Sequence, residues 1–427
     1  MPSIRRSDGA ALVHRLLSGL TLSGILALST LPAMAGEGDL AGGGTSPAPE
    51  TGYSSLTLPV SNFGFRGVAR DRFGSLYLSS TLKNGIFILP SSCRNEDCAT
   101  LVPLSPSLSD PGDVVADPVH GGAYVLLRLG GKVDYLPRGC LGVACMESHP
   151  LPERPAYPFR AVYDRGRQRL AVLDRLSNKI VLLSAGCHAS RCLSFLPLPS
   201  GSGVPSGMAY DPRRKVLWVT YRQGTLVRIP PSCRRLSCET TYPPREKGLG
   251  LFSPAISAQD DVLYLAAKKG GAIGWIDLAE PSPTLRLASL EPTSGQIVHL
   301  TPLPSGGIYL VTGPVDGLPP GESHPHGGFF SRPKGAQGGF DLRLFDLPGG
   351  TPSALASGGH KDLWLTIDDE DALFRLSLAC KRKTPVLSKS CVTRIPFEKI
   401  ETLYHSRYHQ EIQVPKEPSP DLSHPSD

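Results

Sequence analysis

Residues 207–238 read GMAYDPRRKVLWVTYRQGTLVRIPPSCRRLSC. This stretch holds three short apolar segments separated by polar turns, and it ends in two cysteines with four residues between them. The apolar segments are rich in Val, Leu, Ile and Tyr and are bounded by turn-forming residues, which is the pattern of β-strands. The stretch therefore predicts three consecutive strands followed by a loop that two cysteines close.

The same unit recurs along the chain at a fixed period. Its first strand ends in an aspartate at intervals of 46 or 47 residues, at Asp71, Asp117, Asp164 and Asp211. Cysteine pairs of the form C-x4-C follow in the same frame, at Cys93/Cys98, Cys140/Cys145, Cys187/Cys192 and Cys233/Cys238. A fourth apolar segment follows each pair, for example LSFLPL at 193–198. A constant period of this length means that one structural unit is copied along the chain.

Three further units keep the strand pattern without the C-x4-C pair, and the last of them contains a wider pair, Cys380/Cys391. Seven units thus run from about Arg66 to Phe397. Four-strand repeats of ~40–50 residues are typical of propeller blades, whereas β-solenoid repeats are usually shorter. The sequence predicts an all-β β-propeller with seven four-stranded blades, and six or eight blades are the alternatives.

The closure of the ring also has a sequence signal. Residues 54–60 resemble the fourth strand at 193–198, so we expect this N-terminal strand to complete the last blade. Pairing the two ends of the chain would remove free sheet edges. Residues 392–397 compete for the same place in the last blade.

The repeat resembles NHL and YVTN-type propeller repeats. The similarity lies in the G-[VM]-A-x-D opening, the LY[LV] or LW[LV] second strand and the N-x-I or G-x-[LI] third strand. It covers about 330 of the 427 residues, and the C-x4-C loop is not part of it. The resemblance implies a propeller that acts more often as a binding platform than as an enzyme.

The N-terminus has the pattern of a secretory signal. Arg5, Arg6 and Arg15 precede and flank an uncharged apolar stretch, and Ala33-Met34-Ala35 forms a small-x-small cleavage site. We predict a signal peptide at 1–35, a disordered linker at 36–52, the propeller at 53–400 and a largely disordered extension at 401–427. The mature chain has no predicted membrane span and is expected in the periplasm, secreted or at the cell surface.

The ten cysteines form five pairs with none left over. An even count in an exported chain predicts disulfides, and each small loop should contribute less than the ~3 kcal/mol of a 15-residue loop. Metal binding is the rival interpretation, but pairs on different blades cannot share one ion. A redox-active C-x4-C remains an alternative.

The formal net charge of +6 is spread thinly, so the sequence gives no indication of nucleic-acid binding. It also predicts no cofactor and no metal site. The repeated aspartates are expected to accept hydrogen bonds from the backbone of their own turns.

Ligands of propellers usually meet the channel near the start of the innermost strands. There the residues vary between units, as Arg66, Asp113, Arg160, Ser206, Ser253, Gln296 and Ser353. Two arginines can hold an anionic ligand, or they can pair with Asp113 and seal the channel. His299 is a candidate general base, as in streptogramin-lyase-like propellers, or a buried structural histidine. A lactonase-like ion site is poorly supported because this set offers one carboxylate.

The sixth unit contains an apparent insertion at 313–339 between its second and third strands. His324, His326, Phe329 and Phe330 are the candidate residues of a partner-contact loop there. We favour this interpretation over a metal site at the two histidines, and a loop without a binding role over both. Taken together, the sequence favours a binding or scaffolding module for a protein or other extracytoplasmic partner. The competing class is an enzyme at the channel mouth, either a lyase or a lactonase-like hydrolase.

Overall fold

The computed structural model describes residues 64–396, with gaps at 94–97, 105–108, 153–154, 187–191, 234–237, 244–248, 268–270, 281–282, 291–294, 314–324, 332–340, 348–350, 358–361, 368–371 and 378–391. The chain divides into two compact units, Met1–Tyr53 and Ser54–Asp427, and every described residue lies in the second. The predicted signal peptide, linker and C-terminal extension therefore fall outside the described residues.

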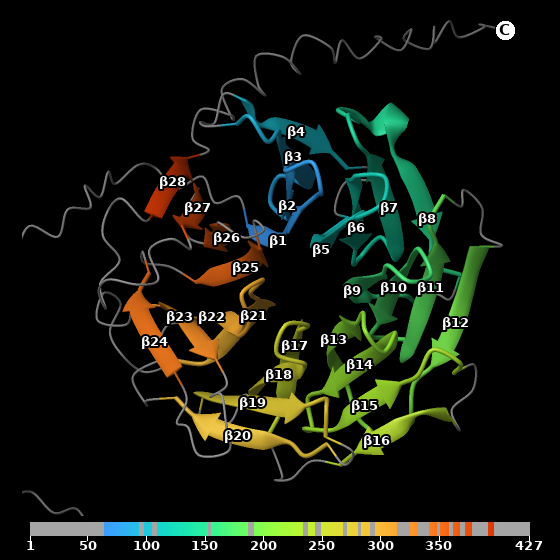
Figure 1. The fold of residues 1–427 in the computed structure, drawn as a ribbon. Helices are drawn as coiled ribbons and strands as arrows, with labels where there is room; N and C mark the ends of the chain where they lie inside the picture. The colour runs from blue at the N-terminus through green and yellow to red at the C-terminus, as the bar shows by residue number, and fades with distance from the viewer. Residues whose placement is uncertain are drawn as a thin grey trace, which may run out of the picture. The chain divides into compact units, whose positions relative to one another are not determined.

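Seven four-stranded antiparallel sheets stand around a common axis, which confirms the β-propeller with seven blades (Figure 1). The first blade contains β1 (Phe65–Arg70), β2 (Leu76–Ser80), β3 (Gly85–Leu89) and β4 (Thr100–Pro103). The second contains β5 (Pro111–Ala116), β6 (Gly122–Leu127), β7 (Lys132–Pro137) and β8 (Glu147–Pro150), with a 3-10 turn, η2 (Val143–Cys145), before β8. The third contains β9 (Pro158–Asp164), β10 (Arg169–Asp174), β11 (Lys179–Ser184) and β12 (Leu193–Pro197).

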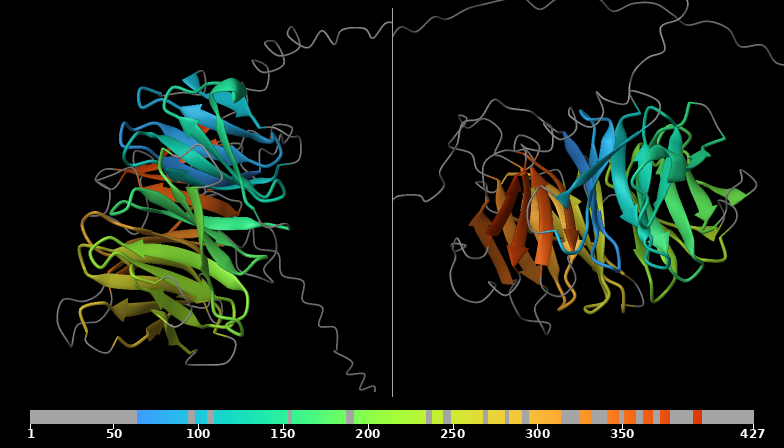
Figure 2. Two further views of the ribbon diagram at one scale, coloured as in Figure 1. Left: turned by 90° about the vertical axis from the view of Figure 1, so that its right-hand side faces the viewer. Right: turned by 90° about the horizontal axis from the view of Figure 1, so that it is seen from above.

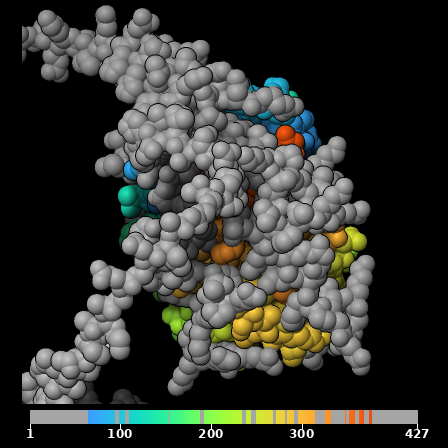
Figure 3. Space-filling model, turned by 90° about the vertical axis from the view of Figure 1, so that its left-hand side faces the viewer, coloured from blue at the N-terminus to red at the C-terminus, as the bar shows by residue number. Residues whose placement is uncertain are grey.

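The remaining blades repeat this order, and the side view in Figure 2 shows their sheets standing next to one another. The fourth blade contains β13 (Pro205–Asp211), β14 (Val216–Tyr221), β15 (Leu226–Ile229) and β16 (Thr240–Tyr242). The fifth contains β17 (Leu251–Ser257), β18 (Val262–Ala267), β19 (Ala272–Asp277) and β20 (Arg286–Ser289), and its yellow atoms reach the surface in Figure 3. The sixth contains β21 (Ile297–Pro302), β22 (Ile308–Thr312), β23 (His326–Ser331) and β24 (Asp341–Asp346). The seventh contains β25 (Pro352–Ser357), β26 (Asp362–Ile367), β27 (Ala372–Ser377) and β28 (Val392–Pro396).

The hydrophobic core lies between neighbouring blades. The second strands β6, β14 and β18 are buried along their whole length, because each has another sheet on both of its faces. Each interface forms its own cluster; Met208, Leu217 and Val219 of the fourth blade, for example, pack on Leu173 and Leu182 of the third. The propeller is therefore held together by successive layers of blade-to-blade contact.

The ring closes by packing of the first blade against the last. Phe65, Val68 and Leu78 share one buried cluster with Ala354 and Leu373. The fourth strand of the last blade is β28, so the place we expected residues 54–60 to fill is taken by the competing segment. Because four consecutive strands already complete this sheet, the ring needs no N-terminal strand there. Residues 54–60 themselves lie outside the described residues.

The repeated aspartates hold their turns as predicted. Asp71 Oδ1 accepts hydrogen bonds from the backbone N–H groups of Phe73 and Ser75, each at 2.9 Å. Asp117, Asp164 and Asp211 accept equivalent backbone bonds in the other blades. All four are at most 4% exposed. Their carboxylates are thus structural parts of the fold.

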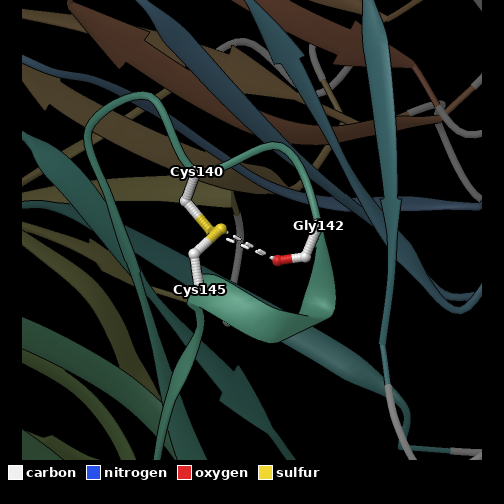
Figure 4. Close-up of a disulfide and its surroundings, with 3 residues drawn as sticks. All are labelled: Cys140, Gly142 and Cys145. Atoms are coloured by element: carbon white, nitrogen blue, oxygen red, sulfur yellow. Dashed lines mark hydrogen bonds between the residues drawn. A yellow bond between two sulfur atoms is a disulfide. The ribbon is translucent and has the colours of Figure 1, made fainter.

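The C-x4-C loops join the third and fourth strands and are closed by disulfides. The bonds are Cys93–Cys98, Cys140–Cys145 and Cys233–Cys238, with Cα–Cα distances of 5.5, 5.6 and 5.3 Å. In the second blade the carbonyl oxygen of Gly142 lies 3.2 and 3.1 Å from the two sulfur atoms (Figure 4). Cys192 is also disulfide-bonded, whereas Cys187, Cys380 and Cys391 lie outside the described residues.

The predicted loop of the sixth blade is wrong in its bounds. Residues 326–331 form β23, the third strand, and the segment that we took for the third strand is β24, the fourth. Phe330 is 2% exposed and packs edge-on against Tyr264 of the fifth blade at 5.9 Å. Phe329 is half-buried and packs on Tyr309 at 5.1 Å.

These two phenylalanines therefore belong to the propeller core and not to a partner-contact loop. His326 is half-buried within β23, and its backbone N–H donates to Thr312 Oγ1 at 3.0 Å. His324 lies outside the described residues. The sequence error has a physical origin, since the paired glycines of HGGFF resemble a turn but here are buried within the strand β23.

Candidate functional site

The first strand of every blade carries a register shift close to its start. These strands lie innermost around the axis (Figure 1), so all seven irregularities fall at the same end of the channel. We call this end, where the first strands begin, the proximal mouth, and the opposite end the distal mouth. A β-bulge re-aims side chains and is common beside functional sites. The proximal mouth is therefore the candidate location of a binding site.

Strand pairing identifies the equivalent channel positions. In every blade, one residue of the first strand pairs with a residue near the middle of the second strand. These pairs are Ala69↔Tyr77, Val115↔Tyr124, Val162↔Ala171, Ala209↔Trp218, Ala255↔Tyr264, Thr301↔Tyr309 and Ala356↔Trp364. The equivalent channel position lies two residues before the first-strand member of each pair. The seven equivalent residues are Gly67, Asp113, Arg160, Gly207, Ser253, His299 and Ala354. We call this set the channel layer.

The channel layer brings together three of the four predicted ligand-binding residues, Asp113, Arg160 and His299. The fourth, Arg66, lies one position earlier, at the bulge of β1, and is exposed. Ser206 and Ser353 are likewise one position earlier, and Gln296 precedes β21. The bulges shift these residues out of the layer that simple alignment at the repeat period assigned to them.

Asp113 connects the second and third blades. Its Oδ2 accepts a hydrogen bond from the backbone N–H of Ala161 at 3.0 Å, and its Oδ1 lies 3.6 Å from Arg160 Nη1. The Asp113 side chain is 19% exposed and that of Arg160 32%. Burial raises the pKa of Asp113, while the Arg160 charge and the bond from Ala161 act in the opposite direction. Arg160 therefore pairs with Asp113, which was one of the two alternatives, whereas Arg66 is exposed.

His299 lies in the channel layer of the sixth blade. Burial, together with the Arg160 charge, lowers the pKa of His299 to about 3, and a hydrogen bond to the backbone of Ser353 acts against this shift. The imidazole is therefore neutral at pH 7. Its bond to Ser353 links the sixth blade to the seventh.

Two members of the channel layer are glycines because the next blade approaches too closely for a side chain. A Cβ on Gly67 would lie 2.7 Å from the carbonyl oxygen of Gly112 and 2.8 Å from the backbone nitrogen of Val114. A Cβ on Gly207 would lie 2.4 Å from Pro254 Cδ. The channel layer thus combines positions of close interblade contact with positions bridged by side chains.

Three arginines that were not predicted from the sequence lie along one side of the proximal mouth. Arg128, Arg175 and Arg222 immediately follow the second strands β6, β10 and β14, at a constant spacing of 47 residues. Because second strands run opposite to first strands, these residues emerge beside the starts of the first strands. That spacing was the signal that could have revealed them. We call the three residues the arginine arc.

The distal mouth has a different character. A depression of about 340 Å³ opens there between the ends of β9, β13, β17 and β21. Val162, Met208, Ala255 and Leu300 line it, and Arg165 alone among its lining residues carries a charge. The lining of this depression is thus mainly apolar, whereas Asp113, Arg160 and His299 lie near the proximal starts of their strands.

No metal centre is formed by the part of the chain that the structure describes, where no group of three or more His, Cys, Asp or Glu side chains converges. Asp113 is the single carboxylate of the channel layer. A lactonase-like ion site would need several oxygen ligands around one divalent ion. Within the same residues, no helix has the length and apolarity needed to cross a membrane.

Comparison with known proteins identifies the class of fold. No protein-family model matches the chain, and no curated protein matches it in sequence. A streptogramin B lyase structure is 13% identical, with a TM-score of 0.59 over 73% of this chain and 93% of the lyase. A catalytically inactive histidine-to-alanine variant of virginiamycin B lyase from Staphylococcus aureus, with quinupristin, is 14% identical, with a TM-score of 0.57 over 73% and 94%.

A chain of the Mitotic Checkpoint Complex is also similar, at 12% identity and a TM-score of 0.55 over 73% of this chain and 88% of that chain. These neighbours include an enzyme and a component of a protein assembly, and identities this low show the fold alone. The protein is a seven-bladed β-propeller. The comparisons do not single out the NHL type.

Proposed function

We propose that the protein is an exported binding module in the periplasm, secreted or at the cell surface. It would hold a protein or another extracytoplasmic partner on its proximal mouth. The observation that carries this proposal is the state of the channel layer, whose ionisable groups are engaged in contacts between blades. Asp113 bridges to Ala161 and Arg160, and His299 bridges to Ser353.

The histidine argues against acid–base chemistry in the channel. A general base works best when its pKa lies near the working pH, because it must both be unprotonated and attract a proton. The pKa of His299 is about 3, so its imidazole is a weak proton acceptor at pH 7. The channel layer is therefore better suited to holding blades than to abstracting protons.

The disulfides and the N-terminal pattern support export. Disulfides persist in oxidising compartments and are rare in the cytosol. Three closed C-x4-C loops among the described residues fit such a compartment, as does the signal-like sequence at 1–35. A rigid, cross-linked propeller offers a stable platform for recognition outside the cell.

Site-specific photo-cross-linking tests the proposal. A photoreactive amino acid is placed at position 176, exposed on the proximal mouth, or at position 165, on the distal mouth, and the full chain is irradiated in the exported fraction of its own host. We expect one discrete adduct from position 176 and none from position 165. An adduct that forms equally from both positions, or from neither, would contradict a binding surface at the proximal mouth.

A lyase is the second candidate, because Asp113, Arg160 and His299 share the channel layer and streptogramin-type lyases have the same fold. Quinupristin is the probe, since it accompanies one of the similar structures. Conversion of quinupristin by the wild-type chain, lost in His299→Ala, would favour the lyase. We expect no conversion by either chain.

A further inference from the structure

The arginine arc places three guanidinium groups on three successive blades. Arg128 follows β6, Arg175 follows β10 and Arg222 follows β14, all at the proximal mouth. Arginine presents a planar fork of donors that matches carboxylates, and its charge does not titrate in the physiological range. The positive charge of such a row at one mouth must be balanced by carboxylates of the protein or by bound anions.

Only part of that charge is balanced within the described residues. Arg128 Nη2 lies 2.5 Å from Asp110 Oδ1, and Arg160 pairs with Asp113. Arg175 and Arg222 form no ion pair with any described residue. Asp174, next to Arg175, instead accepts hydrogen bonds from the backbone N–H of Tyr157 and from the Ser177 hydroxyl. Among the described residues, these two guanidinium groups are thus without a carboxylate partner.

Arg175 is held in a fixed orientation. Its guanidinium carbon lies 3.9 Å from the centre of the Phe159 ring, and its Nε donates to the carbonyl oxygen of Pro205 in the next blade at 3.3 Å. Burial lowers the pKa of Arg175, and the nearby charges of Arg222, Arg160 and Arg128 lower it further. Four neighbouring positive charges, of which two are paired with carboxylates among the described residues, favour a bound anion, which would relieve their repulsion.

We propose that the proximal mouth binds an acidic segment of a partner protein, with Arg175 and Arg222 as its carboxylate-binding residues. This inference rests on the proposed binding function and adds the chemistry of the partner. An extended acidic segment fits better than a small anion because the arc spans three successive blades. The rings of Phe159 and Tyr157, stacked 6.5 Å apart, provide an apolar surface beside the Arg175 guanidinium group.

A short fluorescent oligoglutamate peptide is the probe, and its binding to the full chain is followed by anisotropy at increasing salt. We expect saturable binding that weakens with salt, because exposed charges are screened. The double variant Arg175→Gln/Arg222→Gln should raise Kd about tenfold or more. Arg165→Gln is the matched control for each single substitution, since it removes one charge from an exposed arginine at the distal mouth that has no ion pair with the described residues.

Arg222→Gln alone provides a variant that should fold normally. The Arg222 side chain is exposed and forms no hydrogen bond or ion pair with the described residues. We expect it to weaken the peptide severalfold, while Arg222→Lys, which keeps the charge, loses less. Equal weakening by Arg165→Gln would mean that net charge alone attracts the peptide, and the inference would be wrong.

Citrate and oligoglutamine separate the remaining possibilities. If citrate binds as tightly as oligoglutamate and loses affinity in the same variants, the mouth is a small-anion site and the acidic segment is excluded. Oligoglutamine should not bind. A cross-linked partner at position 176 together with no oligoglutamate binding would leave the binding function standing and overturn this inference alone.

Discussion

The Asp113 carboxylate accepts a hydrogen bond at 3.0 Å from the backbone N–H of Ala161, in the next blade. The same contact recurs between the fifth and sixth blades, where Ser253 Oγ accepts from the backbone N–H of Leu300 at 3.1 Å. Arg160 and His299, which precede these N–H groups, occupy equivalent positions. An aspartate and a serine side chain thus accept the same hydrogen bond between neighbouring blades at two points of the ring.

Replacing Asp113 tests this role. Asp113→Ala leaves the Ala161 N–H unpaired and the Arg160 charge uncompensated, so we expect the free energy of unfolding to fall by about 1–3 kcal/mol. Asp113→Asn keeps an acceptor and should cost less than the alanine variant. Ser253→Ala, the matched change between neutral groups, should cost about 0.5–1.5 kcal/mol. Denaturant unfolding measures all three, and an alanine variant as stable as wild type would contradict the bridge.

Gly67 tests the close approach of the first two blades. A methyl group at this position would press on the carbonyl oxygen of Gly112 and the nitrogen of Val114, which are backbone atoms and cannot rotate away. We expect Gly67→Ala to destabilise the protein by about 1–3 kcal/mol. Gly142→Ala is the control because a Cβ there meets nothing within 4 Å. Similar thermal midpoints for the two variants would refute the crowded interface.

The pH dependence of stability should carry the signature of His299. Its pKa is about 3 in the folded protein against 6.5 for the unperturbed group, so between these values the unfolded chain binds more protons. Stability due to this group therefore rises with pH, by roughly 2–3 kcal/mol between pH 4.5 and 7.

His299→Gln should flatten that rise when unfolding is measured at both pH values. Asp113 acts with the opposite sign, because its raised pKa makes the folded protein bind more protons than the unfolded chain above pH 3.8. In Asp113→Asn the rise with pH should therefore become steeper. A variant pair with unchanged pH profiles would show that neither group is buried in the folded ring.

The cysteines give a test of both pairing and export. All ten should be oxidised in protein isolated from the exported fraction, so a thiol reagent added in denaturant should find none free. Cys93→Ser/Cys98→Ser should lower the free energy of unfolding by roughly 2 kcal/mol, the expectation for so short a loop. Two free thiols per chain would contradict one of the predicted pairs that lie outside the described residues.

The blades could be predicted from the sequence because each carries the same local signals. The apolar second strands, the turn aspartates and the C-x4-C loops repeat in one frame, so an error in one unit is corrected by the others. The sixth blade was mispredicted where that redundancy fails. HGGFFS has a glycine pair typical of a turn, yet Phe330 is buried against the fifth blade.

The channel layer was predicted only in part for a different reason. Asp113, Arg160 and His299 were named from the sequence, but the bulges shift the register by one or two residues and conceal which positions are equivalent. Arg66, Ser206 and Ser353 were chosen where Gly67, Gly207 and Ala354 occupy the layer. The arginine arc was not predicted, because the candidate residues were chosen from the first strands, whereas these arginines follow the second strands.

The most direct test of the account is the titration of His299 by NMR, with His299→Gln used to assign its ring signals. A half-buried histidine whose pKa is lowered to about 3 by desolvation should stay neutral until the pH falls to about 4 or below. A ring that titrates between pH 6 and 7, together with conversion of a substrate that the variant cannot convert, would contradict the binding module and establish a catalytic channel.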